Sequence, residues 1–307
     1  MEVQSILSKF KVNSRCAGRP PAVVEIAPRG VLAASLPLLG QTPTYAFQAL
    51  VAGTVVPGIE EPNLRPPETV TDAVRSTMEK VSSNSRAVTI VLPDATTRVF
   101  MLEFDDLPEN VDDAVAILRF RLRKVVPFDV ENARISYQML PPQGTKCRVL
   151  VAVIPGPVHA EYEAAVHAAG YEPGAVLPTG LAALAALNSS DPVLSASLSE
   201  MSLTTSITNS DDILLYRTHV LSNEPVERAS EVRRDIAVAV AYFEDKLMTR
   251  PQCLHYAGIG TAEEFASSMP EPELAVVDLA PRPRVADGVL PEDTNIAGVT
   301  GALAGAR

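Results

Sequence analysis

Tryptophan is absent from the 307-residue chain and aromatic residues make up only 5% of it, so aliphatic side chains must build the core. The three cysteines, Cys16, Cys147 and Cys253, are far apart and odd in number, which excludes a disulfide framework and zinc-ligand spacing. They favour a reducing, cytoplasmic location. No apolar run reaches the ~20 residues of a membrane-spanning helix, and we expect no secretory signal.

Basic residues are fewer than acidic ones, 26 against 37, which gives a net charge of −11. This balance argues against a protein that holds nucleic acid by bulk charge. The hydrophobic content of 47% excludes a wholly disordered chain, and the 26 prolines predict short elements with many turns.

The motifs of well-known catalytic sites are missing as well. The chain contains no phosphate-binding P-loop, no dinucleotide fingerprint, no serine-hydrolase elbow and no zinc-protease motif. The four histidines share no metal-ligand spacing and are interpreted as surface or locally satisfied residues; they are His159, His167, His219 and His255. We expect no metal site and no catalytic residue from these patterns.

Apolar periodicity predicts an α/β protein with a weak internal duplication of its structural pattern. Strands are expected at 22–27, 31–36, 45–56, 87–92, 98–104, 135–140, 149–154, 175–177, 193–198, 203–208, 213–216 and 254–256. Helices are expected at 70–81, 111–125, 158–169, 181–187, 232–247 and from 261, with a short amphipathic one formed by Val3, Ile6, Leu7 and Phe10. Both halves begin with three strands followed by a helix and a strand, which predicts mixed sheets with helices packed on them.

The helix expected at 111–125 has the clearest end signals. Asn110 is a suitable N-cap, acidic residues fill the first turn, and Pro127 stops the helix. Its last turns are basic, although the protein as a whole is acidic, and Phe120 lies off the main apolar stripe.

Several segments resemble the PilM family, the actin-like cytoplasmic proteins of bacterial type IV pilus assembly. They are Leu-Pro-Asp at 92–94, the strand at 98–104, the helix ending in Val-Pro-Phe-Asp at 126–129, the Tyr-Gln strand at 135–140, Gly-Tyr-Glu-Pro at 170–173, Thr-Gly-Leu-Ala at 179–182 and a final helix at 297–304. The cytoplasmic domain of the type II secretion protein GspL is similar.

The resemblance implies an α/β, actin-like (ribonuclease H-like) bilobal fold, with two mixed-sheet lobes and an inserted subdomain. The first lobe would span residues 1–187, with the insert at 93–147. The second lobe would span 188–294, and a C-terminal helix at 295–307 would return to the first lobe.

Members of such a fold hold nucleotide phosphates with two hairpins that carry Asp and Gly. The corresponding nucleotide-loop positions here are Glu25, Ala27, Gly30, Ser197, Ser199, Gly258 and Gly260. Because both hairpins lack the Asp and Gly pattern, the resemblance implies a non-catalytic scaffold without a cofactor. The alternative is an ATPase that binds ATP and Mg²⁺ through Glu25 and Glu200 in shifted geometry.

The resemblance also implies a partner, the cytoplasmic N-terminal tail of a PilN-like inner-membrane protein, held between the first lobe and the insert. The partner-binding residues would be Arg119, Phe120 and Arg123, a basic, aromatic-bearing face. Alternatively, these charges only complement the helix dipole and Phe120 packs on a neighbouring strand. With this partner, the protein would be cytoplasmic and peripheral to the inner membrane, attached only through the partner. The sequence also leaves open that the protein forms a homo-oligomer.

Overall fold

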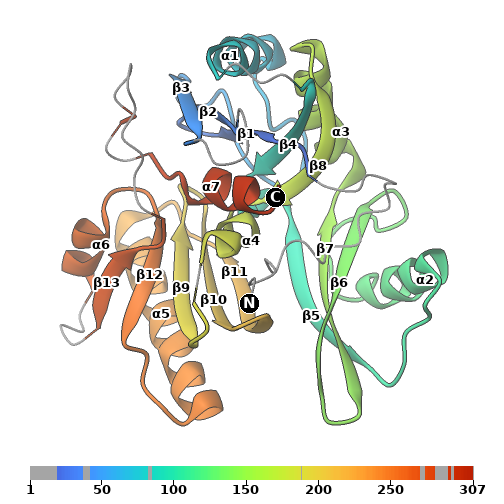
Figure 1. Cartoon of the computed structure of the whole chain (residues 1–307), viewed down its shortest axis with the longest axis vertical. Coiled ribbons are helices and arrows are strands. Elements are labelled where there is room, and N and C mark those ends of the chain that lie inside the picture. The colour runs from blue at the N-terminus through green and yellow to red at the C-terminus, as the bar shows by residue number, and fades with distance from the viewer. Residues whose placement is uncertain are drawn as a thin grey trace.

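The computed structural model describes residues 19–36, 42–81, 85–187, 189–269, 274–280, 290–291 and 294–306. The short helix expected from Val3, Ile6, Leu7 and Phe10 lies outside these residues, as does Cys16. Figure 1 shows three α/β parts: one at the top, one at the lower left and a smaller one at the lower right. Within the described residues, no helix is long and apolar enough to cross a membrane.

The first lobe is a five-stranded mixed sheet of order β3-β2-β1-β4-β8. Its strands are β1 (Ala22–Ala27), β2 (Gly30–Ser35), β3 (Thr44–Ala49), β4 (Ala87–Leu92) and β8 (Glu172–Pro178). The first three strands are antiparallel, and β4 and β8 continue the sheet in parallel with β1. One face packs against α1 (Pro67–Lys80) and α3 (Gly156–Ala168), and the other against α7 (Ala297–Ala304).

The second lobe repeats this topology with strand order β11-β10-β9-β12-β13. Its strands are β9 (Val193–Leu198), β10 (Ser202–Asn209), β11 (Asp212–Val220), β12 (Cys253–Gly258) and β13 (Ala275–Asp278). The helices α5 (Pro225–Leu247) and α6 (Ala262–Ser268) pack on the sheet. The three antiparallel and two parallel strands occur in the same spatial order as in the first lobe. The expected duplication is therefore confirmed.

A three-stranded antiparallel sheet of order β5-β7-β6 forms the inserted subdomain. It contains β5 (Arg98–Phe104), β6 (Arg134–Gln143) and β7 (Lys146–Ile154), and α2 (Val111–Leu122) packs on one face. The expected insert boundary at residue 147 falls inside β7, which pairs with both other strands. The insert must extend to Ile154, because β7 is the central strand of its sheet.

The inserted sheet also connects the two lobes. Its second face packs against β11 and against the short helices α4 (Thr179–Ala183) and η3 (Leu184–Ala186), which lie between the lobes. The α7 helix returns from the end of the chain to α4 and to strands β1, β2 and β4 of the first lobe. The three parts therefore share buried contacts at one central junction, visible around α4 and α7 in Figure 1.

Local signals in the sequence explain several element ends. The Asn110 side chain caps α2 by accepting from the backbone N–H groups of Asp112 and Asp113. The expected strand at 45–56 is shorter, because the chain leaves β3 after Ala49 and makes a loop closed by an isolated bridge between Val55 and Leu64. The helix expected to reach residue 125 ends at Leu122.

Candidate functional site: the cleft between the lobes and a peptide-sized groove

The first predicted nucleotide-loop positions, Glu25, Ala27 and Gly30, lie on the β1–β2 hairpin. Gly30 has a packing role, because a Cβ atom there would lie 2.3 Å from the carbonyl oxygen of Gln48 and 2.6 Å from the ring of Phe47. The glycine therefore lets β2 approach β3 closely. This role is independent of any phosphate.

Glu25 is buried at the base of the cleft between the two lobes. Its Oε1 atom accepts a hydrogen bond from the Thr179 hydroxyl at 3.0 Å, and that hydroxyl lies equally close to the carbonyl oxygen of Leu92. Among the described residues, nothing donates to its Oε2 atom. Burial raises the pKa of Glu25 to about 8, and the carboxyls of Asp94 and Glu200 add to the rise. The low-dielectric surroundings therefore oppose a charge on this carboxyl.

The second predicted hairpin, with Ser197 and Ser199, is held in place by arginines. Arg29 on the first hairpin forms an ion pair with Glu200, with 2.8 Å between its Nε and Oε1. A second arginine, Arg228 of α5, donates to the carbonyl oxygens of Glu200 and Ser199 at 2.7 and 2.5 Å. The Glu200 carboxylate is thus engaged in an ion pair between the hairpins. The alternative Mg²⁺ site would need this same carboxylate.

The third predicted loop lies at the end of β12, where Gly258 is the last strand residue and Gly260 comes after the strand. A Cβ atom on Gly258 would lie 2.3 Å from the hydroxyl of Tyr256, which donates to the carbonyl oxygen of Ile259 at 2.6 Å. Gly260 has a φ of +77°, and a Cβ there would meet the carboxylate of Glu264, which closes the capping box of α6. Both glycines are explained by this local packing and turn geometry.

Asp94 is a buried cleft residue that the sequence-based site did not include. It follows β4 and accepts hydrogen bonds from the backbone N–H of Gly180 at 2.8 Å and from the Thr204 hydroxyl at 2.7 Å. Burial raises its pKa to about 6, although both hydrogen bonds oppose the rise. Asp94 therefore links the first lobe, α4 and β10 of the second lobe. An Asp two residues after a buried strand was the only signal of this role in the sequence.

The cavity that remains between the hairpins is small, about 70 Å³. Small-molecule sites usually enclose about 300–1,000 Å³. The described residues also contain no group of three His, Cys, Asp or Glu side chains that could hold a metal ion. A buried Glu25, a paired Glu200 and this small volume do not fit Mg-ATP.

A larger groove of about 460 Å³ lies between the first lobe and the inserted subdomain. Strand β8 and helix α3 form one wall, and α2, β6 and β7 form the other. Among the described strands, β8 pairs only with β4, so its second edge is unpaired and borders the groove. Strand edges of this kind can accept an extended peptide as an additional strand.

The lining of the groove is mostly apolar with a few charged groups at its sides. The apolar part comes from both walls and includes Val111, Val115, Ile135, Val176, Leu177 and Leu181. His159 and Glu163 of α3 form an ion-pair contact of 3.1 Å when the imidazole is charged, but burial lowers the pKa of His159. An apolar trough with few convergent polar groups is typical of binding sites. The partner-binding site predicted from the sequence included neither His159 nor the strand β8.

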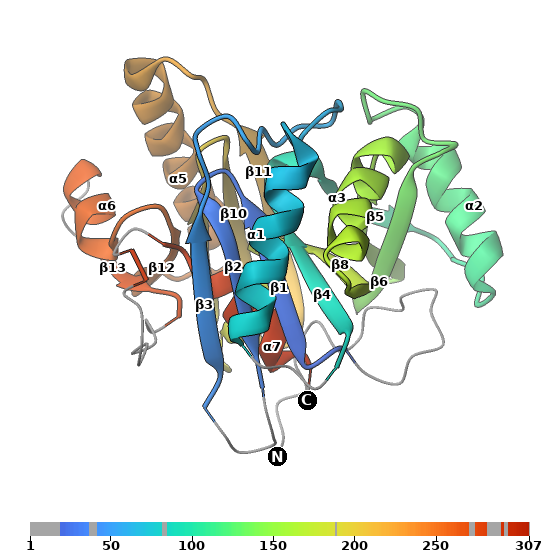
Figure 2. The ribbon, with the colours of Figure 1, turned by 90° about the horizontal axis from the view of Figure 1, so that it is seen from above.

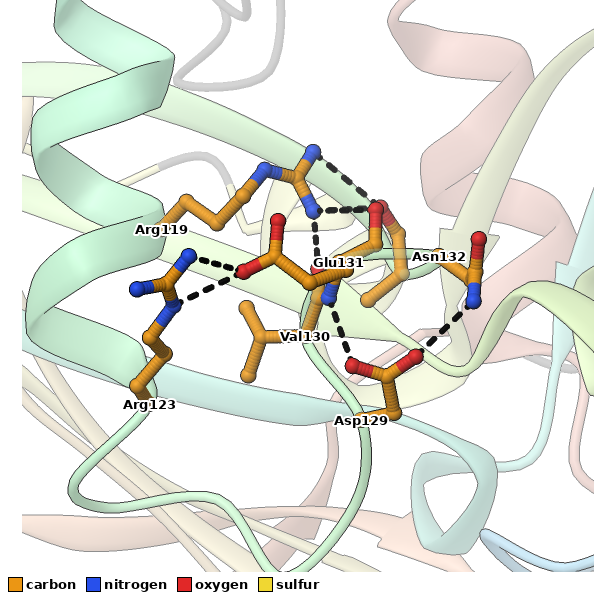
Figure 3. Close-up of polar contacts among 7 residues, drawn as sticks. Arg119, Arg123, Asp129, Val130, Glu131 and Asn132 are labelled. Atoms are coloured by element: carbon orange, nitrogen blue, oxygen red, sulfur yellow. Dashed lines mark hydrogen bonds and ion pairs between the residues drawn. The ribbon is translucent and has the colours of Figure 1, made fainter.

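The predicted partner-binding arginines make contacts within the subdomain (Figure 3). Arg119 donates to the carbonyl oxygens of Val130, Glu131 and Ala133, in the loop between α2 and β6. Arg123 forms an ion pair with the carboxylate of Glu131. Of the two, only Arg119 lines the groove.

Phe120, the third predicted partner-binding residue, lies outside the groove. Its side chain is 63% exposed, and Lys124 Nζ lies 5.8 Å from the centre of its ring. The alternative in which Phe120 packs on a neighbouring strand is therefore wrong. Of the three residues, only Arg119 lines the groove, and their role in partner binding stays a prediction.

Comparisons with known proteins support the fold. No protein-family model and no curated protein sequence matches the chain. Among solved structures, a PilM-PilN type IV pilus biogenesis complex matches with a TM-score of 0.65 at 16% identity, covering 93% of this chain and 98% of the other. The cytoplasmic domain of EpsL, an inner membrane component of the type II secretion system of Vibrio cholerae, matches with a TM-score of 0.50 at 12% identity, over 92% of each chain.

A third solved structure, a Bacteroides thetaiotaomicron protein with an actin-like ATPase fold and unknown function, matches with a TM-score of 0.51 at 10% identity. That match covers 92% of this chain and 94% of the other. At these identities the likeness concerns the fold. The predicted actin-like bilobal fold is confirmed, and its arrangement is similar to that of the PilM-PilN structure over nearly the whole chain.

Proposed function

We propose that this protein is a non-catalytic scaffold of a pilus or secretion assembly platform, and that its groove binds the cytoplasmic tail of a PilN-like membrane protein. The observation that carries the proposal is the 460 Å³ groove between the first lobe and the insert. The resemblance to PilM implies a tail at this place. A solved structure of similar fold is a complex of PilM with PilN.

The chemistry of the groove suits an extended segment with apolar anchors. The unpaired edge of β8 offers backbone hydrogen bonds, while Val115 and Val176 from opposite walls offer apolar contacts. Arg134 adds a positive charge at the side, which suits a carboxylate on the bound segment. Binding to such a tail would recruit the protein to the inner membrane as a peripheral component.

The cleft between the lobes supports the non-catalytic part of the proposal. The alternative ATPase would need charged carboxylates at Glu25 and Glu200 and an open space for a nucleotide. Burial opposes a charge on Glu25 by raising its pKa, Arg29 pairs with Glu200, and the cavity is small. Mg-ATP at about 1 mM should therefore stabilise the protein by less than ~0.4 kcal/mol, which corresponds to a Kd above that concentration. Thermal denaturation with and without Mg-ATP measures this, and a shift of several degrees would show the nucleotide binding that the alternative requires.

Titration of a fluorescent peptide, taken from the N-terminal tail of the PilN-like partner, tests the groove. We expect saturable binding by the wild-type protein and at least about tenfold weaker binding by Val115→Arg, because the new charge enters the apolar lining.

Ile117→Arg is the matched control, since Ile117 lies on the same helix, is 39% exposed and does not line the groove. Its affinity should equal that of the wild type. Circular dichroism should show the same fold for both variants. An equal loss of affinity in the two variants, or no loss in either, would show that the peptide does not bind in the groove.

A further inference from the structure

The outer face of α5 is apolar although it is exposed to solvent. Val238 and Tyr242 are 46% and 38% exposed, and the exposed Ala237 and Ala241 lie beside them. The opposite side of the helix is buried against the second-lobe sheet; it consists of Val232, Asp235, Ile236, Ala239 and Phe243. Figure 2 shows α5 at the periphery of the second lobe. We call the residues 234, 237, 238, 241, 242 and 245 the α5 face.

The α5 face ends in opposite charges, with Arg234 toward the N-terminal end and Asp245 toward the C-terminal end. The Arg234 side chain is 60% exposed, and Asp245 is exposed as well. Among the described residues, Arg234 contacts Asp235, with 3.6 Å between its Nε and the Oδ1 of Asp235. This distance is beyond that of a hydrogen bond, so the guanidinium can still turn toward another carboxylate.

The positions of these residues match an antiparallel copy of the same helix. Two α5 helices can pack antiparallel about a two-fold axis that lies between them, at the level midway between residues 239 and 240. In this arrangement Arg234 of each copy faces Asp245 of the other copy. In the same register Val238 faces Ala241 of the second copy. A two-fold interface requires this reciprocity, in which residue i faces j and j faces i.

We propose that the α5 face is a homodimer interface in which two copies pair through antiparallel α5 helices. Complementary charge at both ends selects a second copy of this chain as the occupant. Binding of an unrelated partner would not require that Arg234 and Asp245 lie at equal distances from the midpoint of the face. The proposal is independent of the tail-binding groove, which lies between the first lobe and the insert.

The contact is expected to be weak. Stable interfaces bury about 1,200–2,000 Å² in total, and a single pair of helix faces covers less than this. Small alanine side chains at 237 and 241 let the two helices approach to about 8–10 Å between their axes. We therefore expect a reversible dimer at concentrations of about 0.1 mM, in which the charged ends set the orientation.

Sedimentation equilibrium of two charge-reversal variants, Arg234→Glu and Asp245→Lys, tests the proposal. Each variant alone places like charges opposite each other at both ends, so we expect self-association at least about tenfold weaker than in the wild type. A mixture of the two variants should dimerise again. In the mixed pair Glu faces Lys at one end, and the native Arg234 faces the native Asp245 at the other.

Arg121→Glu on α2 serves as control, because it makes the same charge change at an exposed position away from α5. It should dimerise as the wild type does. A wild-type protein that stays monomeric at about 1 mM would overturn the proposal, as would single variants that dimerise normally. A mixture that remains monomeric would overturn the antiparallel pairing.

Discussion

One guanidinium nitrogen of Arg148, on β7, lies 2.9 and 2.8 Å from the two carboxylate oxygens of Asp212, at the start of β11. The second nitrogen donates to the carbonyl oxygen of Ile213 at 2.7 Å. The side chains of Arg148 and Asp212 are only 5% and 17% exposed. This ion pair joins the inserted subdomain to the second lobe.

We predict that Arg148→Met lowers the free energy of unfolding by about 3–5 kcal/mol, because it leaves the largely buried Asp212 carboxylate unpaired. The double variant Arg148→Met with Asp212→Leu should recover much of this loss, since it removes both charges. Urea denaturation measures both. The exposed pair between Lys146 and Asp105 is the control, and Lys146→Ala should leave the free energy of unfolding nearly unchanged. Equal losses at the two pairs would contradict the proposed junction.

Arg119 and Arg123 should differ in their effect on stability. Arg119→Glu removes the donor that serves three carbonyl oxygens of the loop after α2, and we expect a loss of about 2–3 kcal/mol. Arg123→Glu breaks one exposed ion pair with Glu131 and should cost less than about 1 kcal/mol. Urea denaturation of both variants distinguishes these values. An Arg119→Glu variant that is as stable as the wild type would show that the loop does not depend on this contact.

The buried carboxyl of Glu25 should make stability depend on pH. Burial raises its pKa from 4.5 to about 8, so between these values the folded state holds a proton that the unfolded state has released. This contribution to stability is therefore fully present below pH 4.5 and is lost as the pH rises to about 8.

Glu25→Gln should remove this dependence, because the amide stays neutral and still accepts from Thr179. We expect its free energy of unfolding to rise relative to the wild type by up to ~1.4 kcal/mol per pH unit between pH 5 and 8. Denaturation at a series of pH values measures the difference. Parallel profiles for the two proteins would show that Glu25 has an ordinary pKa.

The packing of α7 on α4 should require a glycine at position 301. A Cβ atom there would lie 2.0 Å from the carbonyl oxygen of Ala182 and 3.2 Å from the Cα atom of Ala183. Because the backbone of α4 must then move, Gly301→Ala should destabilise the protein by about 1–3 kcal/mol. Gly58→Ala is the control, since its nearest atoms would be 3.9 Å away or farther. Thermal denaturation should separate the two variants.

Much of the local structure follows directly from the sequence. The apolar runs at 22–27, 87–92, 98–104 and 193–198 coincide with observed strands, and the Asn110 cap and the helix expected to begin near residue 261 are confirmed. These features depend on residues within one or two turns or strand positions of each other. The bilobal fold was predicted from the resemblance, and the repeated strand pattern agrees with it.

The sites depend on contacts between residues far apart in the chain, which local periodicity does not encode. Arg29 pairs with Glu200 over 171 positions, and Asp94 bonds to Thr204 over 110. Only the packing of the two lobes against each other brings these groups together, and burial is the main cause of the raised pKa values of Glu25 and Asp94. The sequence alone determined the strands, the caps and the absence of familiar catalytic motifs. Tertiary packing decided which polar groups meet, because it sets both their distances and their exposure to water.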